Sequence, residues 1–218
     1  MVDQIKTDDI TLQLPDVKLK AFLSVPENPR GAVLFAHGSG SSRHSPRNQY
    51  TAKVFQNVGF CTLLMDLLTP DEEKTDIIDR KHRFNIPLLA HRLAEATDWF
   101  VQQDAYKNFP VGYFGASTGA AAALIAAAQR STIVKAVVSR GGRPDLAGQF
   151  LPKVQCPTLF IVGGNDYGVI ELNEDAFNML RCEKHFEIVS GATHLFEEPG
   201  KLEEVAMLTK EFFDHHLL

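Results

Sequence analysis

The sequence predicts an α/β protein with a mostly parallel central sheet of about eight strands and helices on both faces. Two observations favour this class. Short runs of consecutive apolar residues, many of them β-branched, are typical of strands buried on both faces. Longer segments of helical periodicity separate these runs along the whole chain, as in a sheet built from crossover units. With 218 residues and no linker or internal repeat, we expect one domain spanning residues 1–218.

The first two strands are predicted to form a hairpin at the sheet edge, because they alternate polar and apolar residues and are separated by the turn pair Pro15-Asp16. The longest helix carries apolar residues at three- and four-residue spacing. The predicted strands are 10–14, 19–25, 32–36, 61–65, 111–114, 136–139, 158–162 and 186–189. The predicted helices are 46–58, 86–103, 118–129, 172–181 and 202–216.

Composition excludes several classes of protein. Hydrophobic residues make up 44% and charged residues 22%, as in folded globular proteins. The formal net charge of -5 argues against a general binder of nucleic acid or of anionic membranes. The longest apolar stretch, 119–128, is far short of the ~20 residues that a membrane helix needs, and the polar N-terminal segment shows no secretory signal.

The three cysteines are odd in number and show no C-x-x-C pairing, which argues against a disulfide framework or a zinc site. We expect reduced thiols and a cytoplasmic location. They are Cys61, Cys156 and Cys182.

The loops that leave the carboxyl ends of the parallel strands are expected to build any ligand site. One polar stretch, 69–85, connects a predicted strand to a predicted helix and does not separate two domains. It is either a solvated connection or a rim over the site.

A sharp strand-to-helix turn gives the strongest functional signal. Residues 115–119 read Gly-Ala-Ser-Thr-Gly, between a predicted strand and an alanine-rich helix that we expect to pack closely on the sheet. This nucleophile elbow requires residues without bulk two positions before and after its centre, which Gly115 and Gly119 provide. It would lift the Ser117 hydroxyl above the sheet and direct the first helix amides at the same point.

A serine nucleophile needs a general base and a carboxylate that orients the base. Asp166 follows the strand 158–162, and His194 follows the strand 186–189. The chain order Ser117, Asp166, His194 is that of the α/β-hydrolase arrangement.

Other candidates have simpler explanations. Asp145 is the rival acid, since it follows the strand 136–139, and Asp66 is expected to cap a loop. His37 is interpreted as a structural histidine that orients its loop. His215 and His216 lie in the last turn of the final helix, where positive charge is favourable.

The chain resembles the small, lidless α/β-hydrolases that are similar to dienelactone hydrolases. The resemblance rests on residues 115–119, 163–166 and 191–194, and on residues 35–40, which read Phe-Ala-His-Gly-Ser-Gly. In this family the oxyanion hole uses the amide after the nucleophile and one just after the His-Gly pair, which implies Thr118 and Ser39. Dienelactone hydrolases proper use a cysteine nucleophile, so serine at position 117 departs from them.

Together these features predict a serine hydrolase that cleaves a carboxylic ester, thioester or lactone of a small molecule without a metal or other cofactor. An acyltransferase with the same triad and a catalytically silent binding domain are the alternatives. The oligomeric state is left open between monomer and homodimer.

Three arginines lie in loops expected at the catalytic edge, and guanidinium groups suit carboxylate or phosphate. They predict an anionic substrate, unless each arginine pairs with a nearby carboxylate or holds its own loop. They are Arg43, Arg140 and Arg143.

Overall fold

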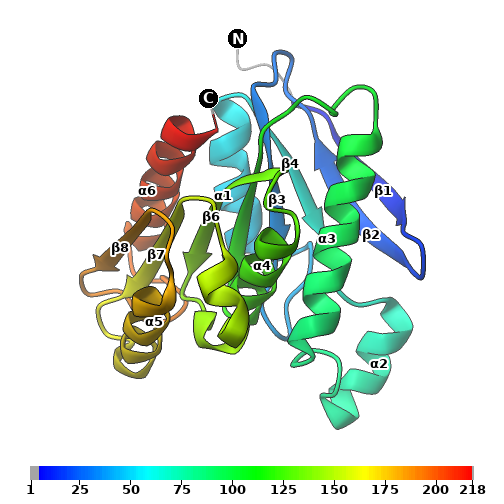
Figure 1. Ribbon diagram of the computed structural model, residues 1–218. Helices are drawn as coiled ribbons and strands as arrows, with labels where there is room; N and C mark the ends of the chain where they lie inside the picture. Colours follow the sequence, from blue (N-terminus) through cyan, green and yellow to red (C-terminus); the bar gives the residue numbers. More distant parts are fainter. Residues whose placement is uncertain (1–4, 218) are drawn as a thin grey trace.

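The computed structural model describes residues 5–217 and shows an eight-stranded sheet with helices on both faces, as the sequence predicts (Figure 1). The strands are β1 (Thr7–Gln13), β2 (Lys18–Ser24), β3 (Gly31–Ala36), β4 (Phe60–Met65), β5 (Val111–Ala116), β6 (Val134–Arg140), β7 (Thr158–Gly163) and β8 (Lys184–Val189). The helices are α1 (Pro46–Asn57), α2 (Pro70–Asp79), α3 (Ile86–Gln102), α4 (Thr118–Gln129), α5 (Tyr167–Met179) and α6 (Lys201–His216), with a 3-10 segment η1 (Pro144–Lys153).

The strand order across the sheet is β1-β2-β4-β3-β5-β6-β7-β8. The predicted edge hairpin is confirmed: β1 pairs antiparallel with β2, and β2 pairs antiparallel with β4. All pairs from β4 to β8 are parallel. After β3 the chain moves outward to β4 and then returns to the other side of β3 to form β5. This reversal lies between β3 and β5, where sheets of this kind open a crevice for ligands.

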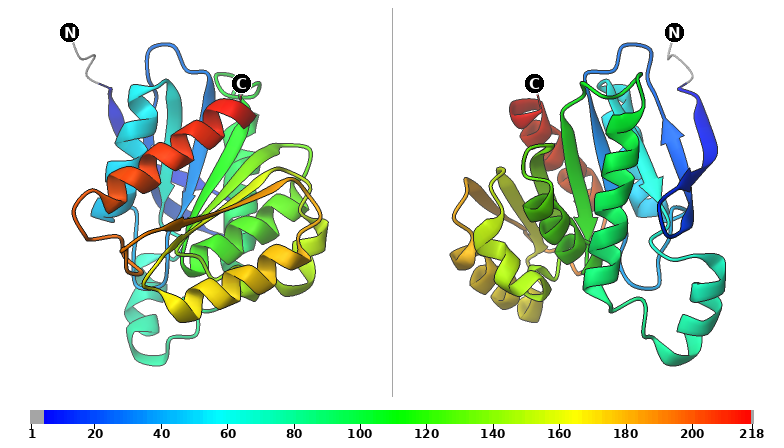
Figure 2. Two further views of the ribbon diagram at one scale, coloured as in Figure 1. Left: turned by 90° about the vertical axis from the view of Figure 1, so that its left-hand side faces the viewer. Right: turned by 45° about the vertical axis from the view of Figure 1, so that its right-hand side comes forward.

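Two hydrophobic layers hold β3 and β5 in place. Helices α1 and α6 lie side by side on one face (Figure 2). On this face, four phenylalanines from both helices and both strands pack with ring centroids 5.1–6.1 Å apart. Each buried ring contributes roughly 1.5–3 kcal/mol through removal of apolar area from water. The rings belong to Phe35, Phe55, Phe114 and Phe213.

On the opposite face, α4 lies directly on the sheet between α3 and η1. Every residue from 118 to 127 is buried, and most of these residues are alanine. Small side chains let the helix backbone approach the strand: a Cβ on Gly115 would lie 2.5 Å from the Ala120 Cα. The alanine-rich sequence therefore sets the distance between α4 and β5.

The sequence prediction differs from the structure in three places. Residues 70–79, expected in a polar connection, form α2, which begins with a capping box between Thr69 and Glu72 and has proline at N1. Only Asp76 of this helix is buried, so α2 has no apolar stripe to reveal it. Segment η1 was not predicted, and α5 begins at Tyr167, five residues earlier than expected.

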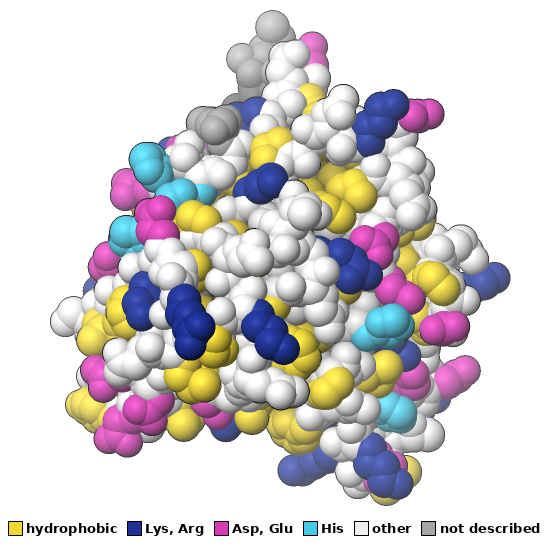
Figure 3. Space-filling view, in the orientation of Figure 1, with side chains coloured by type: hydrophobic (Ala, Val, Ile, Leu, Met, Phe, Trp, Pro, Cys, Tyr) yellow, Lys and Arg dark blue, Asp and Glu magenta, His cyan; other side chains and the backbone are white. Residues whose placement is uncertain are grey.

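The surface of the described residues carries mixed charges. In the view of Figure 3, basic and acidic side chains are scattered among apolar ones, and neither charge dominates this face. None of the helices within residues 5–217 has both the length and the apolarity needed to cross a membrane.

Gly119→Ala is predicted to lower the free energy of unfolding by about 2 kcal/mol or more. A Cβ at this position would lie 2.2 Å from the carbonyl oxygen of Ala36 and 2.5 Å from that of His37, and backbone atoms cannot move aside cheaply. Gly168→Ala is the matched control, because a Cβ there meets no atom of the described chain within 4 Å. The control should raise stability by about 0.5–1 kcal/mol. Urea denaturation of the two variants checks this; equal stabilities would contradict it.

Candidate active site

Ser117 sits at the turn between β5 and α4 with φ 50° and ψ -122°. These dihedrals are unfavourable for a residue with a side chain and cost on the order of 1–3 kcal/mol. The Ser117 amide donates to the Arg140 carbonyl (3.3 Å), and the Ser117 carbonyl accepts from the amides of Ala120 and Arg143 (both 3.0 Å). The strained turn is thus held from the helix and from the end of β6, as expected of a nucleophile elbow.

The loop after β3 lies against this serine. A Cβ on Gly38 would lie 3.0 Å from the Ser117 Cβ and 3.2 Å from the Ala116 carbonyl oxygen, so a side chain at this position would crowd the turn. Among the hydrogen bonds of residues 5–217, neither the Ser39 amide nor the Thr118 amide donates to a protein acceptor. Both expected oxyanion donors therefore flank Ser117 with their N–H groups available.

Asp166 and His194 meet across the turns that follow β7 and β8. The His194 Nδ1 lies 2.6 Å from the Asp166 Oδ2. The two turns are joined by bonds from the Asn165 amide to the Ala192 carbonyl and from the Gly164 amide to the Val189 carbonyl, both 2.9 Å. Since the Asp166 oxygen can only accept as a carboxylate, Nδ1 carries the proton and Nε2 is left as the basic nitrogen.

A cavity of about 210 Å³ contains Ser117 and His194 in its wall, together with Gly38 and Ser39. A larger cavity of about 570 Å³ adjoins it, and the two share five residues of the segment 38–47. Helix α2 contributes Ile77 to the wall of the larger cavity. The polar stretch 69–85 therefore lies on the rim of the site, which is one of the two alternatives that the sequence left open.

The rival acids have other partners. Asp145 accepts two hydrogen bonds from the Arg143 guanidinium, at 2.8 and 2.9 Å. Asp66 accepts from the Arg43 amide at 2.7 Å and pairs with its guanidinium. The structure thus brings Asp166, and not the other two carboxylates, to His194.

His37 is buried behind the loop after β3. Its Nε2 accepts from the Leu67 amide (3.0 Å), so its Nδ1 holds the proton and donates to the Gly38 carbonyl (2.9 Å). Burial lowers the pKa of His37, against the opposing effects of the Gly38 carbonyl and of Asp66. This neutral histidine orients the loop that carries Ser39, in agreement with its structural interpretation.

The three candidate arginines have different environments. Arg43 pairs with Asp66, and Arg143 pairs with Asp145, so carboxylates of the protein already contact both guanidinium groups. Arg140 lines the small cavity and is only 7% exposed. Arg47, which the sequence analysis did not single out, lines both cavities. It lies in the first turn of α1, four residues beyond Arg43.

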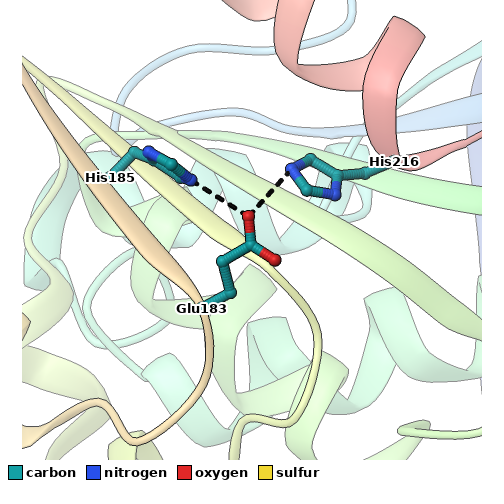
Figure 4. Close-up of side chains that lie close together, drawn as sticks. All are labelled: Glu183, His185 and His216. Carbon is teal, nitrogen blue, oxygen red and sulfur yellow. Dashed lines mark hydrogen bonds and ion pairs between the residues drawn. The ribbon is translucent and has the colours of Figure 1, made fainter.

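In the part of the chain that the structure describes, two clusters could hold a metal ion by the spacing of their ligand atoms. In the cluster of Figure 4, the His185 Nε2 lies 3.2 Å and the His216 Nε2 3.6 Å from the Glu183 Oε1. The other cluster is Asp16, His91 and Glu95. Glu183 lies just before the amino end of β8, whereas Ser117 follows the carboxyl end of β5. The cluster in Figure 4 therefore lies at the opposite end of the parallel strands from Ser117. Within this cluster the Glu183 carboxylate contacts both imidazole rings.

The cysteines lie away from both cavities. Burial raises the pKa of Cys61 and of Cys156 to about 12, which leaves both thiols protonated at neutral pH. Burial also raises the pKa of Cys182. None of the three thiols lies in the wall of the cavity that contains Ser117.

His37 is predicted to make stability depend on pH. Since its pKa is lower in the folded state than the ordinary value of 6.5, the unfolded chain binds a proton first as the pH falls. The free energy of unfolding should thus decrease below about pH 6.5. His216, whose pKa is also lowered by burial, contributes in the same direction.

His37→Gln isolates the His37 contribution, because its amide oxygen can still accept from Leu67. Urea denaturation at pH 7.5 and 5.5 should show a smaller loss of stability for the variant than for the wild type. Equal losses would contradict the assignment.

The chain matches the α/β hydrolase fold family over residues 31–167. A solved structure of a dienelactone hydrolase from Anabaena variabilis is 54% identical and superposes with a TM-score of 0.97, covering 99% of this chain and 100% of that one. A Xanthomonas campestris protein, described as an α/β serine hydrolase without a lid, is 18% identical with a TM-score of 0.77, over 99% of this chain and 97% of that one. At this identity the second likeness concerns the fold.

Two Mycobacterium tuberculosis proteins, named putative phosphoribosyl transferases, are 53% identical over 213 residues. The match covers 98% of this chain and 47% of each relative, so the chain spans about half the length of these curated relatives. The family match and the similarity to the Anabaena structure agree with the fold and with the resemblance noted in the sequence. The chain belongs to the α/β hydrolase fold family and is a dienelactone hydrolase-like member of it.

Proposed function

We propose that this hydrolase cleaves carboxylic esters of small molecules by nucleophilic catalysis, with Ser117 as nucleophile, His194 as general base and Asp166 as the orienting acid. The observation that carries the proposal is the 2.6 Å contact between His194 and Asp166 at the cavity where the strained elbow presents Ser117. Thioesters and lactones present the same electrophilic carbonyl and belong to the same substrate class.

In the first half of the reaction the Ser117 Oγ attacks the carbonyl carbon while the His194 Nε2 takes the hydroxyl proton. Asp166 holds the imidazole by accepting from Nδ1 and stabilises the imidazolium that forms. The amides of Ser39 and Thr118 donate to the developing oxyanion. Collapse of the tetrahedral intermediate breaks the bond to the alcohol, which leaves with the proton held by His194.

In the second half, water attacks the acyl-enzyme with His194 again acting as base. The acid is released and the Ser117 hydroxyl is restored. Removing one oxyanion donor typically costs about 10²–10³-fold in kcat, so the positions of Ser39 and Thr118 contribute to the rate in addition to the triad. The two adjoining cavities would hold the two sides of the ester.

The relatives support this proposal to different extents. The Anabaena protein is described as a dienelactone hydrolase, and a lactone is a cyclic carboxylic ester. The phosphoribosyl transferase name belongs to proteins of which this chain matches 47%, so the proposal concerns the part that they share with it.

Ser117→Ala is predicted to lower ester hydrolysis on the order of 10³-fold or more while the protein remains folded, since the change removes only a hydroxyl group. A panel of p-nitrophenyl esters, thioesters and lactones measures activity. A fluorophosphonate probe should label the wild type at Ser117 and leave the variant unlabelled. The triple variant Cys61→Ala, Cys156→Ala, Cys182→Ala should still be labelled. A folded Ser117→Ala protein with wild-type activity would rule out this nucleophile.

Asp166→Asn is predicted to reduce kcat by about 10²–10⁴-fold, because the amide cannot stabilise the same tautomer and charge of His194. Asp145→Asn is the matched control, since it removes a carboxylate that contacts Arg143 and not His194. Steady-state kinetics on one ester suffices. If Asp145→Asn were the more damaging change, the acid would come from the segment after β6.

Transfer to another acceptor is the alternative for the second half of the reaction. Adding an alcohol or a thiol to the ester assay separates the two cases. A hydrolase gives the free acid as the main product; predominant transfer of the acyl group to the added acceptor would identify an acyltransferase.

A further inference from the structure

Arg140 is a buried cation in the wall of the catalytic cavity. It is the last residue of β6, opposite Ala116 in the register with β5, and therefore one strand away from the nucleophile. Its side chain lines the 210 Å³ cavity together with Ser117 and His194. The 7% exposure of the residue places its guanidinium almost entirely out of solvent.

Within residues 5–217, Arg140 has no carboxylate at ion-pair distance. Its Nη2 lies 3.5 Å from the Asn48 Oδ1, the outer limit of a hydrogen bond, and its Nε is buried without an acceptor. The guanidinium carbon lies 5.9 Å from the centre of the Phe196 ring. Neighbouring arginines pair with carboxylates of the protein: Arg43 with Asp66, Arg47 with Glu197, Arg83 with Asp76, and Arg143 with Asp145.

A buried charge without a partner is unfavourable, and proteins normally satisfy it with an opposite charge. Burial, with the nearby charge of Arg47, lowers the pKa of Arg140 to about 10. The group therefore remains positive at neutral pH. An anion entering the cavity would provide the missing partner.

Two residues of α1 complete the set of donors. Arg47 lines the same cavity, and its ion-pair partner Glu197 is exposed to solvent. Asn48 is 3% exposed and also lines the cavity. We propose that Arg140, Arg47 and Asn48 form a subsite for an anionic group of the substrate, a carboxylate or a phosphate. This rests on the proposed function only in that the substrate is taken to be an ester cleaved at Ser117.

The size of the cavity limits what the subsite can accept. A volume of 210 Å³ equals about seven water molecules at 30 Å³ each. Ser117 and Arg140 line this one small cavity, so the reacting carbonyl and the anionic group must both lie in it or at its mouth. The substrate should therefore have only a few atoms between the two groups. The adjoining 570 Å³ cavity takes the other side of the ester.

The first arm of the test is kinetic and compares matched esters that differ only in charge. In the first pair, 4-acetoxybenzoate and 4-acetoxybenzamide, the anionic member has its charge on the leaving group. In the second pair, monomethyl succinate and methyl succinamate, the anionic member has its charge on the acyl group. Rates are divided by those for hydroxide-catalysed hydrolysis. We expect the wild type to prefer the anionic ester at least about tenfold in kcat/KM in one pair, as expected of a charged hydrogen bond. 4-Acetoxyphenyl phosphate shows whether phosphate is preferred to carboxylate.

Asn48→Asp is the most informative variant, since it places a carboxylate of the same shape beside Arg140. It should raise the Tm by pairing the buried cation, and it should lower the anionic preference at least about tenfold by occupying the subsite. A merely structural Arg140 would give the first effect without the second. Lys53→Met, an exposed change on the same helix with the same change in net charge, is the control and should alter neither.

The second arm measures binding without hydrolysis, so it remains valid if the ester proposal fails. Inorganic phosphate or 4-hydroxybenzoate should raise the Tm of the Ser117→Ala protein above that in chloride of equal ionic strength. Adding Asn48→Asp or Arg140→Met should abolish the rise. If Arg140→Met does not fold, Arg47→Met replaces it and should at least halve the rise.

The subsite proposal is overturned if the wild type shows no anionic preference and neither anion raises the Tm. It is also overturned if preference and stabilisation persist unchanged in Asn48→Asp. A Tm rise with no ester hydrolysis would retain the anion subsite and reject the ester reaction.

Discussion

The close approach of two backbone segments, the loop after β3 and the start of α4, is the constraint on which this site depends. At Gly119 a hydrogen is all that fits against the Ala36 and His37 carbonyls, and at Gly38 the loop touches Ser117. This contact lies where the strand order reverses, so the Ser117 hydroxyl and the amides of Ser39 and Thr118 reach the same region. The aromatic layer under α1 and α6 and the alanine layer of α4 hold both segments in place, which relates the catalytic geometry directly to core packing.

Much of the fold could be predicted from the sequence because strands buried on both faces are visible as consecutive apolar residues. The eight predicted runs lie within or next to the eight strands, and helix 118–129 agrees at both ends. Helix α2 was missed for a physical reason: it buries only Asp76 and leaves Ile77 and Ile78 exposed, so its stability comes from its cap and from ion pairs. Apolar periodicity cannot reveal a helix that is stabilised by its N-terminal cap and by ion pairs rather than by a buried apolar face.

The candidate site was predictable to the extent that it follows from topology. Parallel strands end at one edge, so Asp166 and His194 could be expected near each other from their positions alone. The roles of the arginines could not be separated in this way. Arg43 pairs with Asp66, which lies 23 residues further along the sequence. The lack of an acceptor for the Arg140 Nε depends on all the segments that pack around it, so it cannot be seen in the sequence. Only the pair Arg143 and Asp145, two residues apart, was open to a local argument.

Two unfavourable features meet in the small cavity: a strained backbone at Ser117 and an unpaired guanidinium at Arg140. The chain satisfies buried arginines elsewhere, as in the bidentate pair of Arg92 with Glu72, so its sequence is able to supply such partners. A protein carboxylate beside Arg140 would fill the cavity permanently and add negative charge where the oxyanion forms. A partner that arrives with the substrate instead gains its interaction on binding, and that binding energy can hold the carbonyl against Ser117. The missing partner of Arg140 is therefore consistent with selection for substrate positioning at the expense of stability.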